Sequence, residues 1–242
     1  MDLYAIYTEE VVVLKDNFIK SIKDPWGINI VYWGDMGRVG DWGTGEFAKL
    51  LRRKVKFMIE TIKMKMGDTI IWSDIDIQFF RPCTQAIEKI MADKDFLFLA
   101  EHWPRKEVNV GFIVIRCNPR TLAFYEAVER MDFESMPYLD QSAVNKLLQD
   151  RSQEISWDIL PYQFWSKSIG GPPPRDILLH HANVTFPGVV NGRPVSSLEQ
   201  KFEQFDQIRN FIHSYPLWKW LGWGKLRFWA KAILFRMGLS GI

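Results

Sequence analysis

Two aspartates lie one residue apart in the stretch DTIIWSDIDIQFF, at Asp74 and Asp76, directly after an apolar run. Residues i and i+2 of a strand face the same side, so both carboxylates are expected to meet just past the end of a strand. Two like charges this close repel each other, and a divalent cation is the simplest compensation. Mg²⁺ and Mn²⁺ take such oxygen ligands. The pattern favours a metal site; the alternative is that one acid caps a turn while the other is solvated.

The same Asp-x-Asp pattern is found in phosphohydrolases that use an aspartyl nucleophile. Their motif continues with Gly or Val and then Thr, whereas this chain continues with Ile77, Gln78 and Phe79. The missing hydroxyl disfavours that chemistry, which stays as an alternative function.

Two adjacent histidines supply a further candidate ligand, His180 and His181 in the stretch ILLHHAN. Neighbouring residues of a strand face opposite sides, so at most one of them is expected to reach a shared metal ion. Two aspartates and one histidine at strand ends form a chemically reasonable metal set.

Other polar residues stand at the borders of predicted elements. Asn109 and Gly111 open an apolar strand, where glycine permits close backbone approach. Asp140 and Gln141 precede a helix with apolar periodicity. Asp140 therefore either caps that helix or points with Gln141 into a binding site.

Apolar runs alternate with helix-period segments, which predicts an α/β domain with a largely parallel sheet. A long helix is expected over residues 45–65, and another after Asn118, which can act as a cap before Pro119. The predicted strands are 3–8, 28–33, 69–74, 96–102, 111–117, 155–160 and 177–182.

Composition indicates an ordinary globular protein of 242 residues, 47% hydrophobic and 25% charged. With 31 basic and 29 acidic residues, no overall field favours nucleic acid as a partner. Two cysteines are too few for a disulfide framework, which favours a reducing compartment. The start MDLYAIYTEE lacks a secretory pattern, and no apolar run is long enough to span a bilayer. We expect a cytoplasmic protein.

The order of these motifs resembles that of the GT-A nucleotide-diphospho-sugar transferases, which are metal-dependent glycosyltransferases of the Asp-x-Asp type. The resemblance spans roughly residues 3–190. The motifs are, in order, YT at the end of the first strand, RRKVKFMIETIK, SDID, NVGFIVIRCNP, YLDQSAVN and HHAN.

This resemblance implies a mixed, mostly parallel, Rossmann-like sheet flanked by helices. It also implies a reaction, the transfer of a sugar from a nucleotide-diphosphate donor, such as a UDP-sugar, to a hydroxyl group of a glycan, glycolipid or glycoprotein. It also implies roles for ten residues. Asp74, Asp76 and His181, with His180 as the substitute, would bind Mn²⁺ or Mg²⁺; Asp74 would also contact the donor; Tyr7 and Thr8 would hold the nucleobase; Lys54 would contact the donor; and Asn109, Gly111, Asp140 and Gln141 would lie at the donor sugar and its anomeric centre.

One departure from the family pattern is the absence of Gly-x-Lys-Pro-Trp after the histidine, so a diphosphate-binding lysine is not assigned; Arg193 is a substitute. Similarity to LDQxxxN relatives favours retention of anomeric configuration, whereas an inverting reaction would use Asp140 as the base. A noncatalytic sugar-nucleotide or glycan-binding module is the alternative from a different class.

The C-terminal segment mixes basic residues with tryptophans and has no acid from residue 207 onward. We expect a catalytic domain over 1–195 and a helical extension over 196–242. That extension either packs on the domain or lies on an anionic membrane surface, where indoles and basic side chains meet lipid headgroups.

Overall fold

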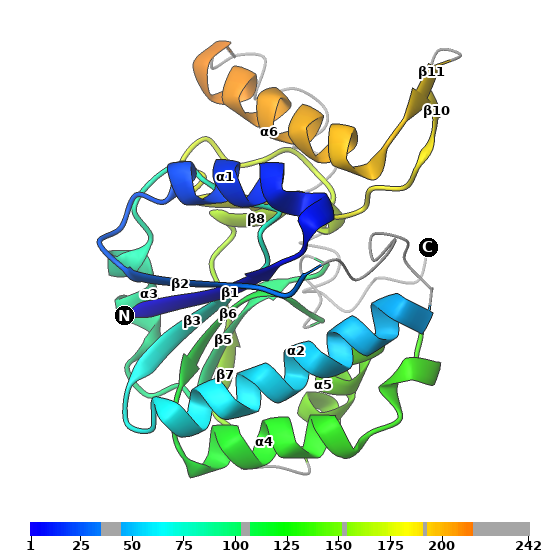
Figure 1. Ribbon diagram of the computed structural model, residues 1–242. Coiled ribbons are helices and arrows are strands. Elements are labelled where there is room, and N and C mark those ends of the chain that lie inside the picture. The colour runs from blue at the N-terminus through cyan, green and yellow to red at the C-terminus, as the bar shows by residue number, and fades with distance from the viewer. Residues whose placement is uncertain (35–44, 103–106, 152–153, 191–192, 215–242) are drawn as a thin grey trace, which may run out of the picture.

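A computed structural model of the protein describes residues 1–34, 45–102, 107–151, 154–190 and 193–214 (Figure 1). The basic, Trp-rich part of the predicted C-terminal extension, residues 215–242, lies outside the described residues.

The centre of the fold is a six-stranded sheet with the strand order β2-β1-β3-β6-β5-β7. Only β6 runs against its neighbours β3 and β5, and the other pairs are parallel. The predicted mixed, mostly parallel α/β sheet is therefore confirmed. Its strands are β1 (Asp2–Tyr7), β2 (Gly27–Tyr32), β3 (Thr69–Ser73), β5 (Phe96–Ala100), β6 (Val108–Arg116) and β7 (Trp157–Ile159).

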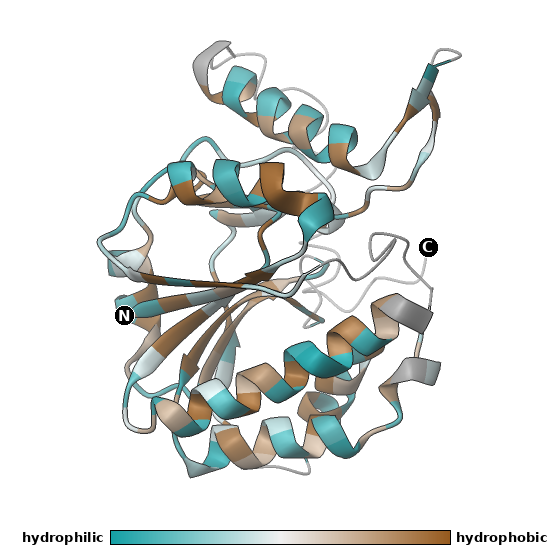
Figure 2. Ribbon diagram, in the orientation of Figure 1, coloured by the Kyte–Doolittle hydropathy of each residue, from teal (hydrophilic) through white to brown (hydrophobic). Residues whose placement is uncertain are grey.

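The central strands β3, β5 and β6 are buried on both faces of the sheet, which explains why they read as apolar runs, whereas the edge strand β2 is largely exposed. In β5, Phe96 and Phe98 enter the core on one face, and Leu97 and Leu99 enter the core on the other. Figure 1 shows helices α2, α4 and α5 on the first face, and Figure 2 shows apolar positions along the strands. These helices are α2 (Gly45–Met64), α4 (Pro119–Arg130) and α5 (Leu139–Asp150), while α1 (Val12–Ser21) and α3 (Thr84–Met91) pack into the core of the second face.

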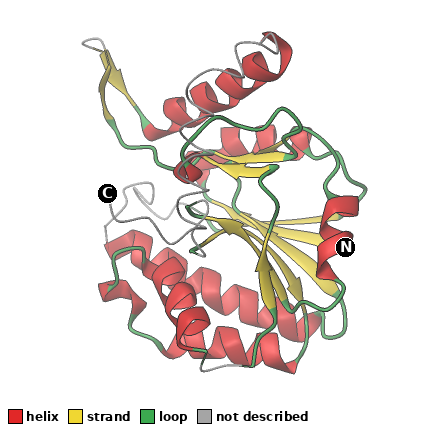
Figure 3. Ribbon diagram, turned by 180° about the vertical axis from the view of Figure 1, so that it is seen from behind, coloured by secondary structure: helices red, strands yellow, loops and turns green. Residues whose placement is uncertain are grey.

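A second, three-stranded sheet with the order β4-β9-β8 lies on the side of α1 and α6 (Figures 1 and 3). It contains the predicted strand 177–182, which therefore does not join the main sheet. Strands of three residues carry too little periodicity for prediction, and four such strands were not predicted. The small sheet comprises β4 (Ile77–Phe79), β8 (Phe164–Ser166) and β9 (Leu179–His181), and a separate hairpin joins β10 (Gly188–Val190) to β11 (Arg193–Val195).

Two helix starts follow local capping rules. Asn118 caps α4 by accepting hydrogen bonds from Arg120 and Thr121, with Pro119 in the first helical position, as predicted. At α6 (Ser197–Ser214), the Ser196 backbone N–H donates to Glu199, and the Glu199 N–H donates back to the Ser196 hydroxyl. Short 3₁₀ turns complete the fold at η1 (Glu9–Val11), η2 (Phe133–Ser135) and η3 (Lys167–Ile169).

One buried carboxylate ties three elements together at the start of β5. Asp95 is 1% exposed and accepts hydrogen bonds from the side chains of Asn118 and Arg120 and from the Ser156 backbone N–H. Burial would raise the pKa of this carboxyl, but these contacts outweigh it and hold the pKa below its usual range.

Asp95→Asn is expected to lower the free energy of unfolding by about 2 kcal/mol, because the amide cannot satisfy the same donors or pair with the guanidinium. The pKa of Asp95 is lowered in the folded protein. Its contribution to the free energy of unfolding is therefore complete above the ordinary carboxyl pKa, and it is lost as the pH falls through the lowered pKa of Asp95. Urea denaturation from about pH 7 to about pH 3 measures it. The exposed neighbour Asp93→Asn is the control; equal effects of both variants would contradict the prediction.

Candidate metal centre

Asp74 and Asp76 lie in the link between the two sheets, after the end of β3 and before β4. Both carboxylates lie just past the end of a strand, as predicted, but strand alternation does not align them, because β3 already ends at Ser73. The link is instead fixed by backbone contacts: the Asp74 N–H donates to the Gly111 carbonyl over 2.7 Å, and the Ala182 N–H donates to the Asp76 carbonyl over 2.9 Å. These contacts hold both aspartates at the carboxyl edge of β3.

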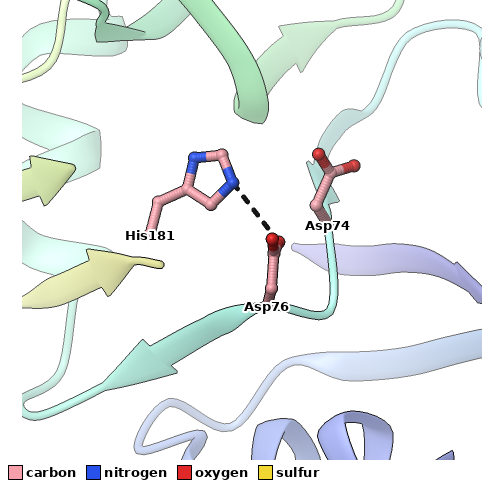
Figure 4. A group of neighbouring side chains, drawn as sticks. All are labelled: Asp74, Asp76 and His181. Atoms are coloured by element: carbon pink, nitrogen blue, oxygen red, sulfur yellow. Dashed lines mark ion pairs between the residues drawn. The ribbon is translucent and has the colours of Figure 1, made fainter. Parts of the chain in front are cut away.

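His181 reaches the same point from the small sheet. Strand β9 pairs with β4 so that His181 is opposite Ile77, one residue after Asp76. The imidazole Nε2 lies 3.3 Å from Asp76 Oδ1, and one ligand atom from each of Asp74, Asp76 and His181 lies within 4.8 Å of the others. Figure 4 shows the three side chains gathered around one space.

The surroundings of His181 fix its orientation and tautomer. The Asn109 amide oxygen accepts from the Gly111 N–H over 2.9 Å, and its amide nitrogen donates to Glu101 over 2.6 Å. His181 Nδ1, 3.0 Å from that oxygen, must therefore carry the hydrogen. Nε2 then faces Asp76 either protonated or through a bound cation. Two carboxylates and a histidine held through its second nitrogen fit a divalent metal ion.

Gly111 is required by the same arrangement. A Cβ at this position would lie 2.4 Å from His181 Cε1 and 3.0 Å from Asn109 Oδ1. Any larger residue would therefore force the imidazole out of its observed position.

The two adjacent histidines face opposite sides of β9. His180 is fully buried; its Nε2 lies 3.1 Å from the Gln204 amide oxygen, and its ring packs on Trp165. Burial lowers the pKa of His180 to about 3, so the ring is neutral at physiological pH. The structure places His181, and not His180, beside Asp76.

Lys54 joins the aspartate link to helix α5. Its buried ammonium lies 3.2 Å from Asp74 Oδ1 and 3.5 Å from Asp140 Oδ2. Burial alone would lower the pKa of Lys54, but the two carboxylates outweigh this and raise it. Burial raises the pKa of Asp140, although Lys54 opposes the change. The capping alternative for Asp140 is wrong, since Tyr138 occupies the cap position and Asp140 lies in the first turn.

The rest of the LDQxxxN motif holds α5 against the first residues of β6. The Gln141 side-chain oxygen accepts from the Val110 N–H over 3.4 Å. Asn145, four residues later on the helix, accepts from the Val108 N–H and donates to its carbonyl. Asn145 is a positioning residue to which the sequence assigned no role, although it is the last residue of the LDQxxxN motif and lies four residues after Gln141.

Tyr7 and Thr8 stand at the end of β1, at the same edge of the main sheet. The Tyr7 ring packs against the Tyr32 ring at a tilt of 39°, with ring centroids 5.1 Å apart, and Thr8 is 5% exposed. Among the described residues, neither makes a hydrogen bond with Asp74, Asp76 or His181. The structure thus brings eight of the ten candidates into one contact network and leaves this pair beside it.

A lysine from α6 completes the surroundings of Asp76. Lys201 Nζ lies 2.6 Å from Asp76 Oδ2 and 2.8 Å from the Ala182 carbonyl oxygen. Together with His181 it outweighs burial and holds the pKa of Asp76 well below its usual range. No local motif marks Lys201, which is distant in the sequence. Arg193, the substitute suggested by the sequence, lies in the exposed hairpin and pairs with Glu199.

The sequence of this chain is similar to that of a known protein family. The family model described as nucleotide-diphospho-sugar transferase matches residues 11–171, more than half of the chain. The chain belongs to the nucleotide-diphospho-sugar transferase family. This membership makes it a glycosyltransferase and favours glycosyl transfer over the phosphohydrolase alternative.

Solved structures with a similar fold are also glycosyltransferases. One is described as involved in glycosylation of the major capsid of PBCV-1; it matches with a TM-score of 0.56 and 13% identity, over 85% of this chain and 100% of its own. The glycosyltransferase GlyE of Streptococcus pneumoniae TIGR4 matches with a TM-score of 0.51 and 12% sequence identity, over 86% of this chain and 64% of its own. The galactosyltransferase LgtC matches with a TM-score of 0.50 and 13% sequence identity, over 90% of this chain and 98% of its own. A comparison with curated protein sequences finds no match.

Lys54→Met is expected to destabilise this transferase by about 3 kcal/mol, because it leaves Asp74 and Asp140 without their shared buried cation. Urea denaturation measures the loss. Lys56, an exposed lysine of the same helix, provides the control, and Lys56→Met should change stability by less than about 0.5 kcal/mol.

Adding Asp140→Asn to Lys54→Met should recover part of the loss, since one of the two unpaired charges is removed. Strictly additive losses, or a Lys54→Met variant as stable as Lys56→Met, would show that the three groups are not coupled.

Proposed function

We propose that this glycosyltransferase moves a sugar from a nucleoside-diphosphate donor, a UDP-sugar, to a hydroxyl group of a glycan or glycolipid with a divalent ion, Mn²⁺ or Mg²⁺. The observation that carries the proposal is the convergence of Asp74, Asp76 and His181 at the carboxyl edge of β3. Open α/β sheets bind ligands at this edge.

The three residues that would hold the ion come from two segments, the link after β3 and the end of β9, which are brought together by the pairing of β4 with β9. When bound, the ion would neutralise the negative charge that develops on the departing diphosphate. Asp74 would bind and orient the donor together with the ion, while Tyr7 and Thr8 at the end of β1 are proposed to hold the nucleobase. The buried Asn109–Gly111 segment holds the His181 ring in place, through the contact of Asn109 with Nδ1 and the close approach of Gly111 to the ring.

Asp140 and Gln141 are the proposed groups beside the anomeric carbon, since Lys54 links Asp140 directly to Asp74. One oxygen of Asp140 accepts from the Gln141 N–H over 3.0 Å and the other pairs with Lys54. An acid engaged in this way is better placed to stabilise positive charge on the sugar than to remove a proton from the acceptor. This supports retention of configuration over inversion.

The proposed acceptor is a glycan or glycolipid hydroxyl, and the C-terminal segment supports a lipid-linked one. No helix within the described ranges is long and apolar enough to cross a bilayer. The basic and Trp-rich composition of residues 215–242 supports contact with an anionic membrane surface, which would suit a lipid-linked acceptor.

The full chain is expected to release nucleoside diphosphate from one member of a UDP-sugar panel only when Mn²⁺ or Mg²⁺ is present. Chelation should remove the activity, and Asp76→Asn should lower it by at least about 100-fold, because one charged ligand of the ion is lost. Chromatographic detection of UDP measures the rate, and proton NMR of the sugar released first should show the anomer of the donor.

Asp150→Asn, an exposed acid at the end of α5, is the matched control and should retain full activity. Donor binding without turnover would favour the noncatalytic module. Full activity in the presence of chelator, or in Asp76→Asn, would refute the metal-dependent mechanism.

A further inference from the structure

Helix α6 is attached to the small sheet by one face. Phe205 is fully buried in the core, Gln204 donates to the Asn183 carbonyl, and Arg209 donates to Gln78 of β4. Lys201 lies one turn before Phe205 and so belongs to the same face. Its position over Asp76 is therefore set by helix packing and by the cap at Ser196, and not by the lysine side chain alone.

The two carboxylate oxygens of Asp76 have different partners. Oδ1 faces His181 Nε2 at 3.3 Å, whereas Oδ2 receives the Lys201 ammonium at 2.6 Å. The side chain of Lys201 is 16% exposed, so solvent screens this pair only partly. The ammonium is thus a positive charge placed directly on one ligand of the candidate metal centre.

A divalent ion bound by Asp76 would lie about 2.1 Å from the carboxylate oxygen. The ion and the ammonium would then share one carboxylate at a separation of only a few ångströms, where two positive charges repel strongly. Lysine has a flexible four-carbon stem, so Nζ can move away without unfolding α6.

We propose that Lys201 competes with the divalent ion for Asp76, so that ion binding displaces the ammonium from the carboxylate. This inference rests on the metal centre assigned under the proposed function. Removal of the charge should strengthen binding of the ion, because the ion no longer has to break an existing pair. A lysine that merely held Asp76 in the correct rotamer would give the opposite result.

The test uses the full chain, freed of metal by chelation, and titrates it with Mn²⁺ alone while electron paramagnetic resonance measures unbound Mn²⁺. Lys201→Met is expected to lower the dissociation constant about tenfold relative to the wild type. Lys201→Arg, which keeps the charge, should restore an affinity near that of the wild type. The exposed Lys89→Met in α3 controls for the change in net charge and should bind like the wild type.

Lys201→Gln keeps a donor for the Ala182 carbonyl without the charge and decides the matter if Lys201→Met does not fold. Equal or weaker Mn²⁺ binding by the folded neutral variant would overturn the competition. Failure of the metal centre itself is distinguishable, since then neither the wild type nor any Lys201 variant would bind Mn²⁺ more tightly than Asp76→Asn.

Discussion

The site depends on how closely packed carboxylates are compensated. Asp74 and Asp76 lie next to each other in the link between two sheets, and Asp140 joins them through Lys54. Burying acids without partners would cost several kcal/mol each, so the fold must bring cationic groups to them. Lys54 supplies one from α2, and Lys201 supplies another from α6. The same concentration of negative charge is what makes the place suitable for a divalent ion.

The small sheet β4-β9-β8 begins directly beside the two aspartates. Strand β4 begins directly after Asp76, and its antiparallel partner β9 places His181 opposite Ile77. Pairing of two three-residue strands is a weak interaction on its own. Here it is supported by the Ala182–Asp76 backbone bond and by α6, whose Phe205 packs into the core below. The three residues of the candidate metal centre thus owe their geometry to packing between segments that are far apart in the sequence.

Sequence predicted the large elements because their signals are strong. Each of the seven predicted strands overlaps an observed one, and the helix at 45–65 matches α2 closely. The membership of Asp74, Asp76 and His181 in one cluster also followed from their placement at strand ends. Their geometry did not follow, because the turn after Ser73 depends on a backbone bond to Gly111 that no periodicity encodes.

Residues that act across long sequence distances were the main omission. Lys201 approaches Asp76 because α6 folds back onto the small sheet, and no sequence pattern near Lys201 predicts this contact. For Lys54 the sequence predicted a contact with the donor, and it did not predict the pairing of the buried ammonium with Asp74 and Asp140. In both cases the local sequence pattern can indicate only that a basic residue lies on a helix, because tertiary packing determines which acid it pairs with.

The central claim is that Asp74, Asp76 and His181 form a metal centre that holds the nucleotide diphosphate of the donor. Crystals grown with Mn²⁺ and UDP, measured at the manganese absorption edge, test it most directly. The account predicts one anomalous peak about 2 to 2.4 Å from an oxygen of each aspartate and from His181 Nε2, with the diphosphate completing its coordination. UDP bound elsewhere, or bound at this edge with no anomalous peak among the three residues, would contradict it.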